Sequence, residues 1–196
     1  ASTGPGEHIL PQLLGQFKLE HPQIRILLRI SRTEEIVEEV RERILEVGIV
    51  GAKTDDSDLV FEPFVKDELV VITGPRHRWT EAGSVELGEL IKEPFILQQP
   101  GAGIRTMLEE GLEQIGLGLK DLNVHMELGL QESVKTAVGD RLGVGIISRF
   151  AVRQELASGA LSEIQVSDLP AFREDFYLVR NRKKNLSRVT EAFLSF

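Results

Sequence analysis

The chain has 196 residues, 41% of them hydrophobic, so it is long enough to bury a core in one large domain or two small lobes. Asp and Glu number 31 against 23 Lys and Arg, and the formal net charge of -8 disfavours binding of this chain to the phosphate backbone of DNA. The absence of cysteine excludes disulfides, thiol catalysis and thiolate metal sites, and no apolar run is long enough to cross a bilayer or resembles a secretory signal.

The N-terminal part predicts a helix followed by a strand. Apolar residues recur at helical spacing over residues 9–17. Pro11 predicts that the regular helix begins near it, and Pro22 predicts its end. Residues 24–30 then alternate isoleucine or leucine with mostly charged side chains, which indicates a mostly buried strand.

A second helix and a second strand follow. Ser31-Arg32-Thr33-Glu34 has the form of a capping box and predicts a helix start. The expected apolar stripe of this helix consists of Ile36, Val37, Val40 and Ile44. Residues 47–50 are short and apolar and predict a buried strand, so the order strand, helix, strand indicates a parallel crossover.

The second half of the chain repeats this alternation. Residues 60–64 and 68–73 predict two strands, and the polar loop 74–78 then breaks the pattern, so we expect a hinge there. Later strands are expected at 95–98, 124–128, 144–147 and 176–179, and helices carry Met107, Leu108, Leu112 and Ile115, then Val134 and Val138, with a closing helix at 186–196. Two α/β lobes follow, with the C-terminal tail returning to the first.

No catalytic or metal-binding constellation is found. The four histidines are scattered over different predicted elements and form no metal-ligand pair; they are His8, His21, His77 and His125. There is no nucleophile elbow and no phosphate-binding P-loop. The stretches 101–103 and 143–145 resemble fragments of a dinucleotide fingerprint but lack its third glycine, so they read as tight turns. We therefore expect no catalytic residue, no metal and no cofactor.

Turns before helices offer another kind of chemistry. Residues 2–6, 31–33 and 101–104 each precede a helix and lie beside a strand. Such turns expose backbone N–H groups, and in open α/β sheets ligands bind beyond the carboxyl ends of the strands. Ser31 and Thr33 are also ordinary helix N-caps, and a hydroxyl can serve both roles.

Five stretches resemble the effector-binding domain of LysR-type transcriptional regulators. The opening Ser2 to Pro11 has the pattern S-T-x-x-G-x-x-x-L-P. Thr33 to Ile36, Gly101 to Arg105, Leu142 to Ile146 and Glu155 to Leu161 follow in the order and spacing of that family. The resemblance covers the whole chain, and within the family it is most similar to the branch concerned with sulfur and related anion metabolism.

The resemblance implies an α/β fold of two Rossmann-like lobes joined by a hinge, like the type 2 periplasmic binding proteins. Lobe I would comprise residues 1–74 and 175–196, and lobe II residues 75–174. It also implies a cytoplasmic regulator of transcription without enzymatic activity, which binds a small-molecule effector and forms a homodimer or tetramer. DNA would be bound only through an N-terminal winged helix-turn-helix, and a start at Ala1 rather than Met fits an upstream portion outside this sequence.

The family's ligand contacts, carried over position by position, predict an interlobe site made of Ser2, Thr3, Ser31, Thr33, Gly101, Ala102, Gly103, Leu130 and Gln131. The chain departs from the family pattern at several of these positions or beside them. Hydroxyls are common in relatives where this chain has Gly4, Ala102, Ile104 and Leu130, and a glycine is common at Arg141.

These departures favour a small anion or carboxylate with a partly apolar body. Helix N-termini near Thr33 and Ile104 would hold the negative group, and Ile104 and Leu130 would contact carbon. The alternative is that the two apolar side chains pack inward and the amides bind sulfate.

Two other functions share this fold. A solute-binding protein of a transporter would need an export signal or lipid anchor in the complete gene, where a regulator has a helix-turn-helix. An enzyme would need a positioned acid, base or nucleophile, and the predicted turns offer hydroxyls and amides without a partnered base. The apolar segment 9–30 is expected to pair with the other lobe of a second copy of the chain. The alternative is a monomer in which these residues all lie in the core.

Overall fold

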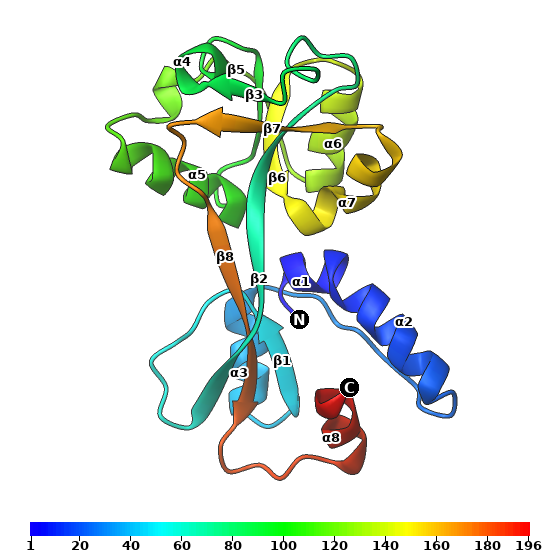
Figure 1. The fold of residues 1–196 in the computed structure, drawn as a ribbon. Helices are drawn as coiled ribbons and strands as arrows, with labels where there is room; N and C mark the ends of the chain where they lie inside the picture. The colour runs from blue at the N-terminus through cyan, green and yellow to red at the C-terminus, as the bar shows by residue number, and fades with distance from the viewer. The chain divides into compact units, whose positions relative to one another are not determined.

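The computed structural model describes every residue from Ala1 to Phe196, and the fold is mixed α/β (Figure 1). The chain forms two compact units: unit 1 is Ala1–Asp67 with Glu174–Phe196, and unit 2 is Glu68–Arg173. The chain first passes from unit 1 to unit 2 within a single strand, β2 (Leu59–Thr73). The loop 74–78, where the sequence predicts a hinge, lies inside unit 2. None of the helices has the length and apolar character needed to span a membrane.

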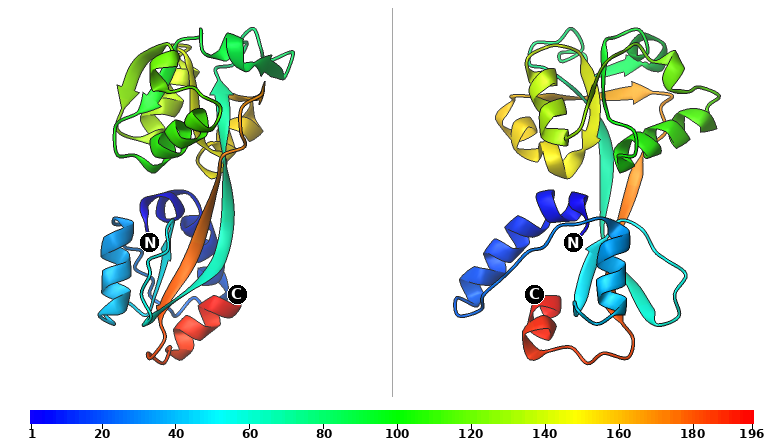
Figure 2. Two further views of the ribbon diagram at one scale, coloured as in Figure 1. Left: turned by 90° about the vertical axis from the view of Figure 1, so that its left-hand side faces the viewer. Right: turned by 180° about the vertical axis from the view of Figure 1, so that it is seen from behind.

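Unit 1 is built on strands that helices cover, in the sheet order β1 (Val47–Val50), β8 (Arg173–Asn181), β2. β1 and β8 form an antiparallel pair, with Ile49 opposite Leu178. The helices of unit 1 are α1 (Thr3–His8), α2 (Leu10–Glu20), α3 (Thr33–Arg41) and α8 (Arg188–Ser195). Figure 2 shows α3 and α8 on opposite sides of the strand pair.

The core of unit 1 follows from the alternation of side chains along these strands. Successive residues of a strand point to opposite faces, so Val50 and Val179 pack with α3, whereas Ile49 and Leu178 pack with Leu10 of α2. The strand pair is therefore buried on both faces.

The N-terminal helix begins at Leu10 with Pro11 in its first turn, as predicted. A shorter helix, α1, precedes it over residues that include two glycines and a proline. Proline is tolerated in the first turn of a helix, where the missing N–H has no intrahelical acceptor, but glycine lowers helix propensity. This composition explains why the sequence did not indicate α1.

The predicted strand at 24–30 is wrong. These residues belong to no strand, and pairing in this region is limited to one parallel bridge between Ser2 and Ser31. Alternation does appear in burial, since Ile24, Ile26 and Leu28 are half-buried and their neighbours are exposed. However, Lys18 Nζ donates to the carbonyl oxygen of Ile24 at 2.5 Å, so this carbonyl bonds a side chain in place of a neighbouring strand. The parallel crossover predicted through this segment is also absent.

The predicted capping box at the start of α3 is wrong as well. The N-cap is Arg32, without a side-chain cap, and the Ser31 hydroxyl instead donates to the Glu35 carboxylate. Ser31 is paired with Ser2 in a parallel bridge, and the N-cap is therefore the next residue, Arg32. The apolar stripe is confirmed for Ile36, Val37 and Val40, but the helix ends at Arg41 and Ile44 is 63% exposed.

Unit 2 contains a mixed sheet. The strands β4 (Phe95–Gln98), β5 (Val124–Leu128) and β6 (Val144–Ser148) are parallel, in the order β6-β4-β5. The end of β2 pairs antiparallel with β6 and with β7 (Ser162–Ser167), and β7 pairs with β3 (Ser84–Glu86). The helices are α4 (Leu87–Leu90), α5 (Gly103–Gln114), η1 (Leu119–Asp121, a 3-10 turn), α6 (Gln131–Gly139) and α7 (Arg149–Ser158).

Helices cover both faces of this sheet (Figure 1). Phe95 and Leu97 of β4 pack with α5 in one apolar cluster, and Ile96 packs with α6 and α7 in the other. The strands predicted at 95–98, 124–128 and 144–147 are confirmed. The two strands predicted at 60–64 and 68–73 form the single strand β2, and Ile115, expected in the helix stripe, lies past the end of α5 and is partly exposed.

Glu46 anchors the C-terminal helix α8 to the rest of unit 1. Its carboxylate accepts hydrogen bonds from the Thr190 hydroxyl, from the Ser187 backbone N–H at 3.0 Å and from the Ser187 hydroxyl at 2.9 Å. These bonds, with that of Thr190 first, hold the pKa of Glu46 below its usual value of 4.5. Phe193 then packs edge-on against Phe17 of α2, with ring centroids 5.4 Å apart.

We expect Glu46→Gln to loosen α8. The substitution removes the charge from three hydrogen bonds at a helix N-terminus and should lower the free energy of unfolding by about 1 kcal/mol. Because the folded-state pKa of Glu46 is depressed, its contribution is present above about pH 4.5 and is lost as the pH falls through the folded pKa. Denaturant unfolding of both proteins from pH 3 to 7 measures this difference.

The control is Glu191→Gln, because Glu191 lies in the first turn of the same helix and forms no side-chain hydrogen bond there. Equal loss of stability in the two variants, or a Glu46→Gln effect that does not shrink in acid, would contradict this role.

Candidate functional site

In unit 1, the structure brings Ser2, Ser31 and the start of α3 together. Ser2 and Ser31 are partners in the parallel bridge, and the Ser2 backbone N–H donates to the carbonyl oxygen of Ile49 at 2.8 Å. Ser2 is buried and is the N-cap of α1, whereas Thr3, the first residue of α1, is exposed. Thr33 is half-buried and is the first residue of α3.

Two of the helices of unit 1, α1 and α3, begin next to each other without side-chain caps. The bridge is parallel, so the two segments that it joins run in the same direction, one into α1 and the other into α3. Neither N-cap, Ser2 or Arg32, makes a side-chain capping hydrogen bond. The N–H groups of a first helical turn have no intrahelical acceptor, and together they carry about half a positive charge. This corner of unit 1 can therefore receive an anion.

In unit 2, the predicted Gly-rich turn also precedes an uncapped helix. β4 ends at Gln98, and α5 begins at Gly103 with Ala102 as its N-cap. Gly101 has a φ of 85°, a left-handed conformation that glycine adopts without strain. Ala102 has no side chain that can cap, so the N–H groups of the first turn of α5 stay free for another acceptor.

The start of α6 lies beside this turn. β5 is parallel to β4, with Leu128 opposite Gln98, and Leu130 is the N-cap of α6. The Gln99 backbone N–H donates to the carbonyl oxygen of Leu128 at 2.9 Å, which ties the two turns together. The side-chain oxygen of Gln131 is buried and has no hydrogen-bond partner in the structure.

The two apolar residues expected to contact ligand carbon have different surroundings. Ile104 is only 6% exposed and packs into the apolar core of unit 2 with Leu108 and Leu112. The expectation that Ile104 contacts a ligand is therefore wrong, because its position in the first turn of α5 faces the sheet. Leu130 is 63% exposed and remains available.

Sequence analysis missed a third helix N-terminus at the same edge of the sheet. β6 is parallel to β4 and ends at Ser148, the N-cap of α7, whose hydroxyl accepts from the Ala151 N–H at 3.3 Å. The serine directly after the apolar run 144–147 is a signal that could have indicated this cap. Arg149 follows, and its hydrogen bond with Glu163 raises the pKa of the guanidinium, which stays engaged with carboxylates.

The candidate positions in both units carry groups that can bind a ligand. These groups are backbone amides, hydroxyls, one amide side chain and one exposed leucine. Among the candidate serines and threonines, only Ser31 is hydrogen-bonded to a His, Asp or Glu side chain: its hydroxyl donates to Glu35. No group of three or more His, Cys, Asp or Glu side chains is placed to hold a metal ion.

Comparison with known proteins identifies the family. Residues 1–196 match the family model described as LysR substrate binding domain. The chain is 29% identical to the HTH-type transcriptional activator CmpR of Synechocystis sp., covering 100% of this chain and 63% of that protein. It is 33% identical to the RuBisCO operon transcriptional regulator of Acidithiobacillus ferrooxidans, covering 100% of this chain and 62% of that protein. The chain thus spans less than two thirds of the length of these relatives.

A solved structure shows the same fold. The regulatory domain of CcmR from Synechocystis PCC6803, in complex with 2-PG, superposes with a TM-score of 0.79 at 25% identity, covering 99% of this chain and 91% of that one. The α/β fold is that of LysR effector-binding domains, which is like that of the type 2 periplasmic binding proteins. The match over the whole sequence shows that this chain belongs to the LysR substrate-binding domain family.

Proposed function

We propose that this chain is the effector-sensing part of a cytoplasmic LysR-type transcriptional regulator and that it binds a small anion without catalysing a reaction. The observation that carries the proposal is the set of uncapped helix N-termini at α1, α3, α5 and α6. The similarity to CmpR and to the RuBisCO operon regulator supports a role in transcription. DNA would be bound through a winged helix-turn-helix that these 196 residues do not include.

We propose that the two units are the two lobes of the sensor and that both contribute to ligand binding. Unit 1 would supply Ser2, Thr3, Ser31 and Thr33, and unit 2 would supply Gly101, Ala102, Gly103, Leu130 and Gln131. The buried, unpartnered oxygen of Gln131 accepts a hydrogen bond, so it fits a hydroxyl or a protonated group of the ligand rather than its anionic end.

The proposed ligand is a small carboxylate with a short apolar part. The N–H groups of the first turn of α3, beside Thr33, favour the negative group, and exposed Leu130 offers a surface for carbon. A desolvated sulfate needs most of its acceptors satisfied, and Ala102 and Leu130 supply no hydroxyl. Placement in the sulfur-metabolism branch rests on the resemblance of sequence motifs. A comparison of sulfate binding with carboxylate binding tests it.

We expect calorimetry to show tighter binding of small aliphatic carboxylates than of sulfate. Thr33→Val should weaken carboxylate binding about tenfold, as expected for loss of one hydrogen bond to a charged group. Thr54→Val is the matched control, because Thr54 is exposed in a loop of unit 1. Tighter binding of sulfate would contradict the carboxylate and favour the sulfur branch, and an unaffected Thr33→Val variant would contradict the site.

Double variants test whether one ligand uses both units. Thr33→Val and Gln131→Leu should each weaken binding of the same carboxylate, and a coupling free energy above about 0.5 kcal/mol in the double-mutant cycle would support a shared ligand. Strictly additive effects would contradict it.

We expect the isolated chain to lack specific affinity for duplex DNA. Its formal net charge of -8 repels the phosphate backbone, and the proposed reading domain is outside these residues. Fluorescence anisotropy with a labelled duplex at physiological salt measures this directly. Tight binding of the chain alone would contradict the proposed division of roles.

We also propose a homodimer, or a tetramer built from it, formed through segment 9–30. Leu19 is 83% exposed and Leu27 is 88% exposed, and a shallow groove of about 470 Å³ lies nearby, lined by Leu14, Gly15, Lys18, Gln23, Arg25 and Ile26. Large apolar side chains exposed beside a groove are typical of protein interfaces.

Sedimentation at high micromolar concentration is expected to show a species of at least twice the chain mass of 21.9 kDa. Leu27→Asp should shift this species towards one chain mass, because a charge would be buried in the interface. Ile44→Asp is the control, since Ile44 is also exposed in unit 1 but lies outside the segment. A single species of one chain mass in the unmodified protein would overturn the proposal.

A further inference from the structure

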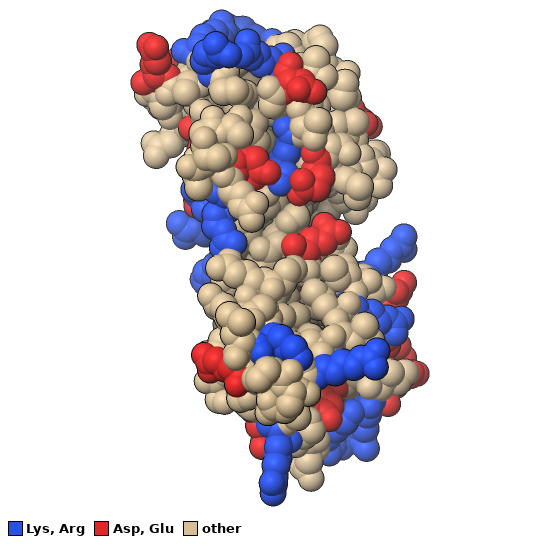
Figure 3. Space-filling model, turned by 90° about the vertical axis from the view of Figure 1, so that its right-hand side faces the viewer, with Lys and Arg blue, Asp and Glu red and all other residues tan.

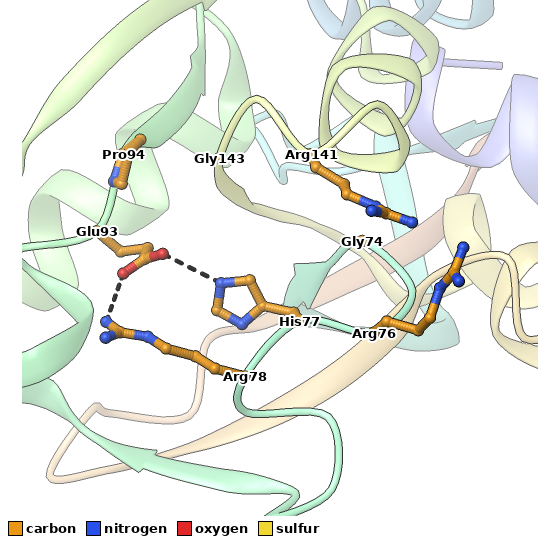
Figure 4. A pocket seen from close by; sticks show the side chains of 8 residues that line it. All are labelled: Gly74, Arg76, His77, Arg78, Glu93, Pro94, Arg141 and Gly143. Atoms are coloured by element: carbon orange, nitrogen blue, oxygen red, sulfur yellow. Dashed lines mark hydrogen bonds and ion pairs between the residues drawn. The ribbon is translucent and has the colours of Figure 1, made fainter.

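A pocket with several charged side chains in its lining lies in unit 2, at the opposite edge of the sheet from the helix N-termini. It has a volume of about 290 Å³ and is lined by Gly74, Arg76, His77, Arg78, Glu93, Pro94, Arg141 and Gly143 (Figure 4). Three loops form it: one follows β2, one precedes β4 and one connects α6 to β6. Because β4 and β6 are parallel, their amino ends meet at this edge and their carboxyl ends meet at the other.

Two glycines hold the three loops close together. A side chain at Gly74 would lie 2.7 Å from the carbonyl oxygen of Val138, at the end of α6. A side chain at Gly143 would lie 2.3 Å from the carbonyl oxygen of Pro94. Both distances are shorter than van der Waals contact, so backbone approaches backbone here and the pocket wall is built by packing that only glycine permits.

One side of the pocket is electrically balanced. Arg78 donates to one oxygen of Glu93 at 2.6 Å, and His77 Nε2 lies 3.1 Å from the other. The Trp79 backbone N–H donates to His77 Nδ1 at 3.4 Å, so Nε2 carries the proton that His77 donates to Glu93. Figure 4 shows these contacts as the two dashed lines. The Glu93 carboxylate is thus already hydrogen-bonded to both Arg78 and His77.

The side chains of Arg76 and Arg141 make no hydrogen bond or ion pair, although both residues line the pocket. The Cγ of Arg141 lies 3.2 Å from the position of a Gly74 side chain, so Arg141 packs over the turn that leads to Arg76. Figure 4 shows both side chains on the same side of that turn, and Figure 3 shows Lys and Arg gathered over the end of unit 2 at the top of the view. Two guanidinium groups without a carboxylate partner therefore line the same pocket.

Both arginines also occupy backbone conformations that favour glycine. Arg76 has a φ of 64° and Arg141 a φ of 63°. Arg141 follows the end of α6, where its N–H donates to Val138 and the next N–H donates to Ala137, the pattern in which glycine is the usual residue. A charged side chain is thus kept at a position where glycine would remove strain. Its location near a helix C-terminus offsets only about half a charge.

We propose that this pocket is a second anion site, which binds a phosphate group either free or at the end of a small phosphomonoester. Arg76 and Arg141 supply two positive charges without internal partners, which matches a phosphate dianion. Guanidinium groups donate paired hydrogen bonds in the geometry of phosphate oxygens. The volume of about 290 Å³ admits a phosphate with a few further atoms. This site does not depend on the function proposed above.

Calorimetry of the chain with inorganic phosphate and with glycerol 3-phosphate tests the proposal. At least one should bind with a dissociation constant below about 1 mM, weakening as ionic strength rises. Tighter binding of glycerol 3-phosphate would identify the phosphomonoester as the ligand, and tighter binding of inorganic phosphate would identify the free ion. Arg76→Gly and Arg141→Gly should each weaken binding about tenfold without loss of thermal stability, because glycine relieves the positive φ.

The control is Arg43→Gly in unit 1. Arg43 has a φ of 63° and follows the end of α3 with the same pair of backbone hydrogen bonds, so the substitution makes the same change of charge and strain elsewhere. It should leave phosphate binding unchanged. Failure of both phosphates to bind, an unaffected Arg76→Gly/Arg141→Gly double variant, or equal weakening by Arg43→Gly would overturn the proposal.

Discussion

The backbone N–H groups at the start of a helix need acceptors, and in this chain the six helices α1 to α6 begin without a side-chain cap that supplies one. Arg32, Ala102 and Leu130 occupy N-cap positions where serine, threonine or aspartate would normally satisfy these groups, and Ser2 makes no capping bond. By contrast, Ser148 and Ser187 cap α7 and α8. Side-chain caps are also absent from α2 and α4, where no ligand contact of the family falls. In our proposal the ligand is the missing acceptor at α1, α3, α5 and α6.

The sheet of unit 2 then separates two kinds of anion chemistry. Its carboxyl edge offers neutral amides and helix dipoles, which suit one carboxylate beside an apolar side chain such as Leu130. Its amino edge carries Arg76 and Arg141, which suit a dianion. The parallel order of β4 and β6 keeps the two edges apart, so a regulator built on this unit could respond to two ligands of different charge.

Apolar patterning predicted most of the fold, because short, continuous apolar runs such as 95–98 and 144–147 are typical of buried strands. It failed where a local contact outweighed periodicity. Lys18 bonds the carbonyl of Ile24 in place of a strand partner, and the bridge to Ser2 displaces Ser31 from the cap of α3. At the site, sequence motifs located the helix starts, but they could not show that Ile104 faces the core or that Arg76 and Arg141, 65 positions apart in the chain, line one pocket.

If free helix amides bind the effector, amide chemical shifts report on this most directly. In a titration of the chain with butyrate followed by two-dimensional NMR, the largest shifts should occur at the first-turn amides of α3, α5 and α6, which are residues 33–35, 103–105 and 131–133. Shifts absent from all three turns, or confined to the loop 74–78, would contradict the claim.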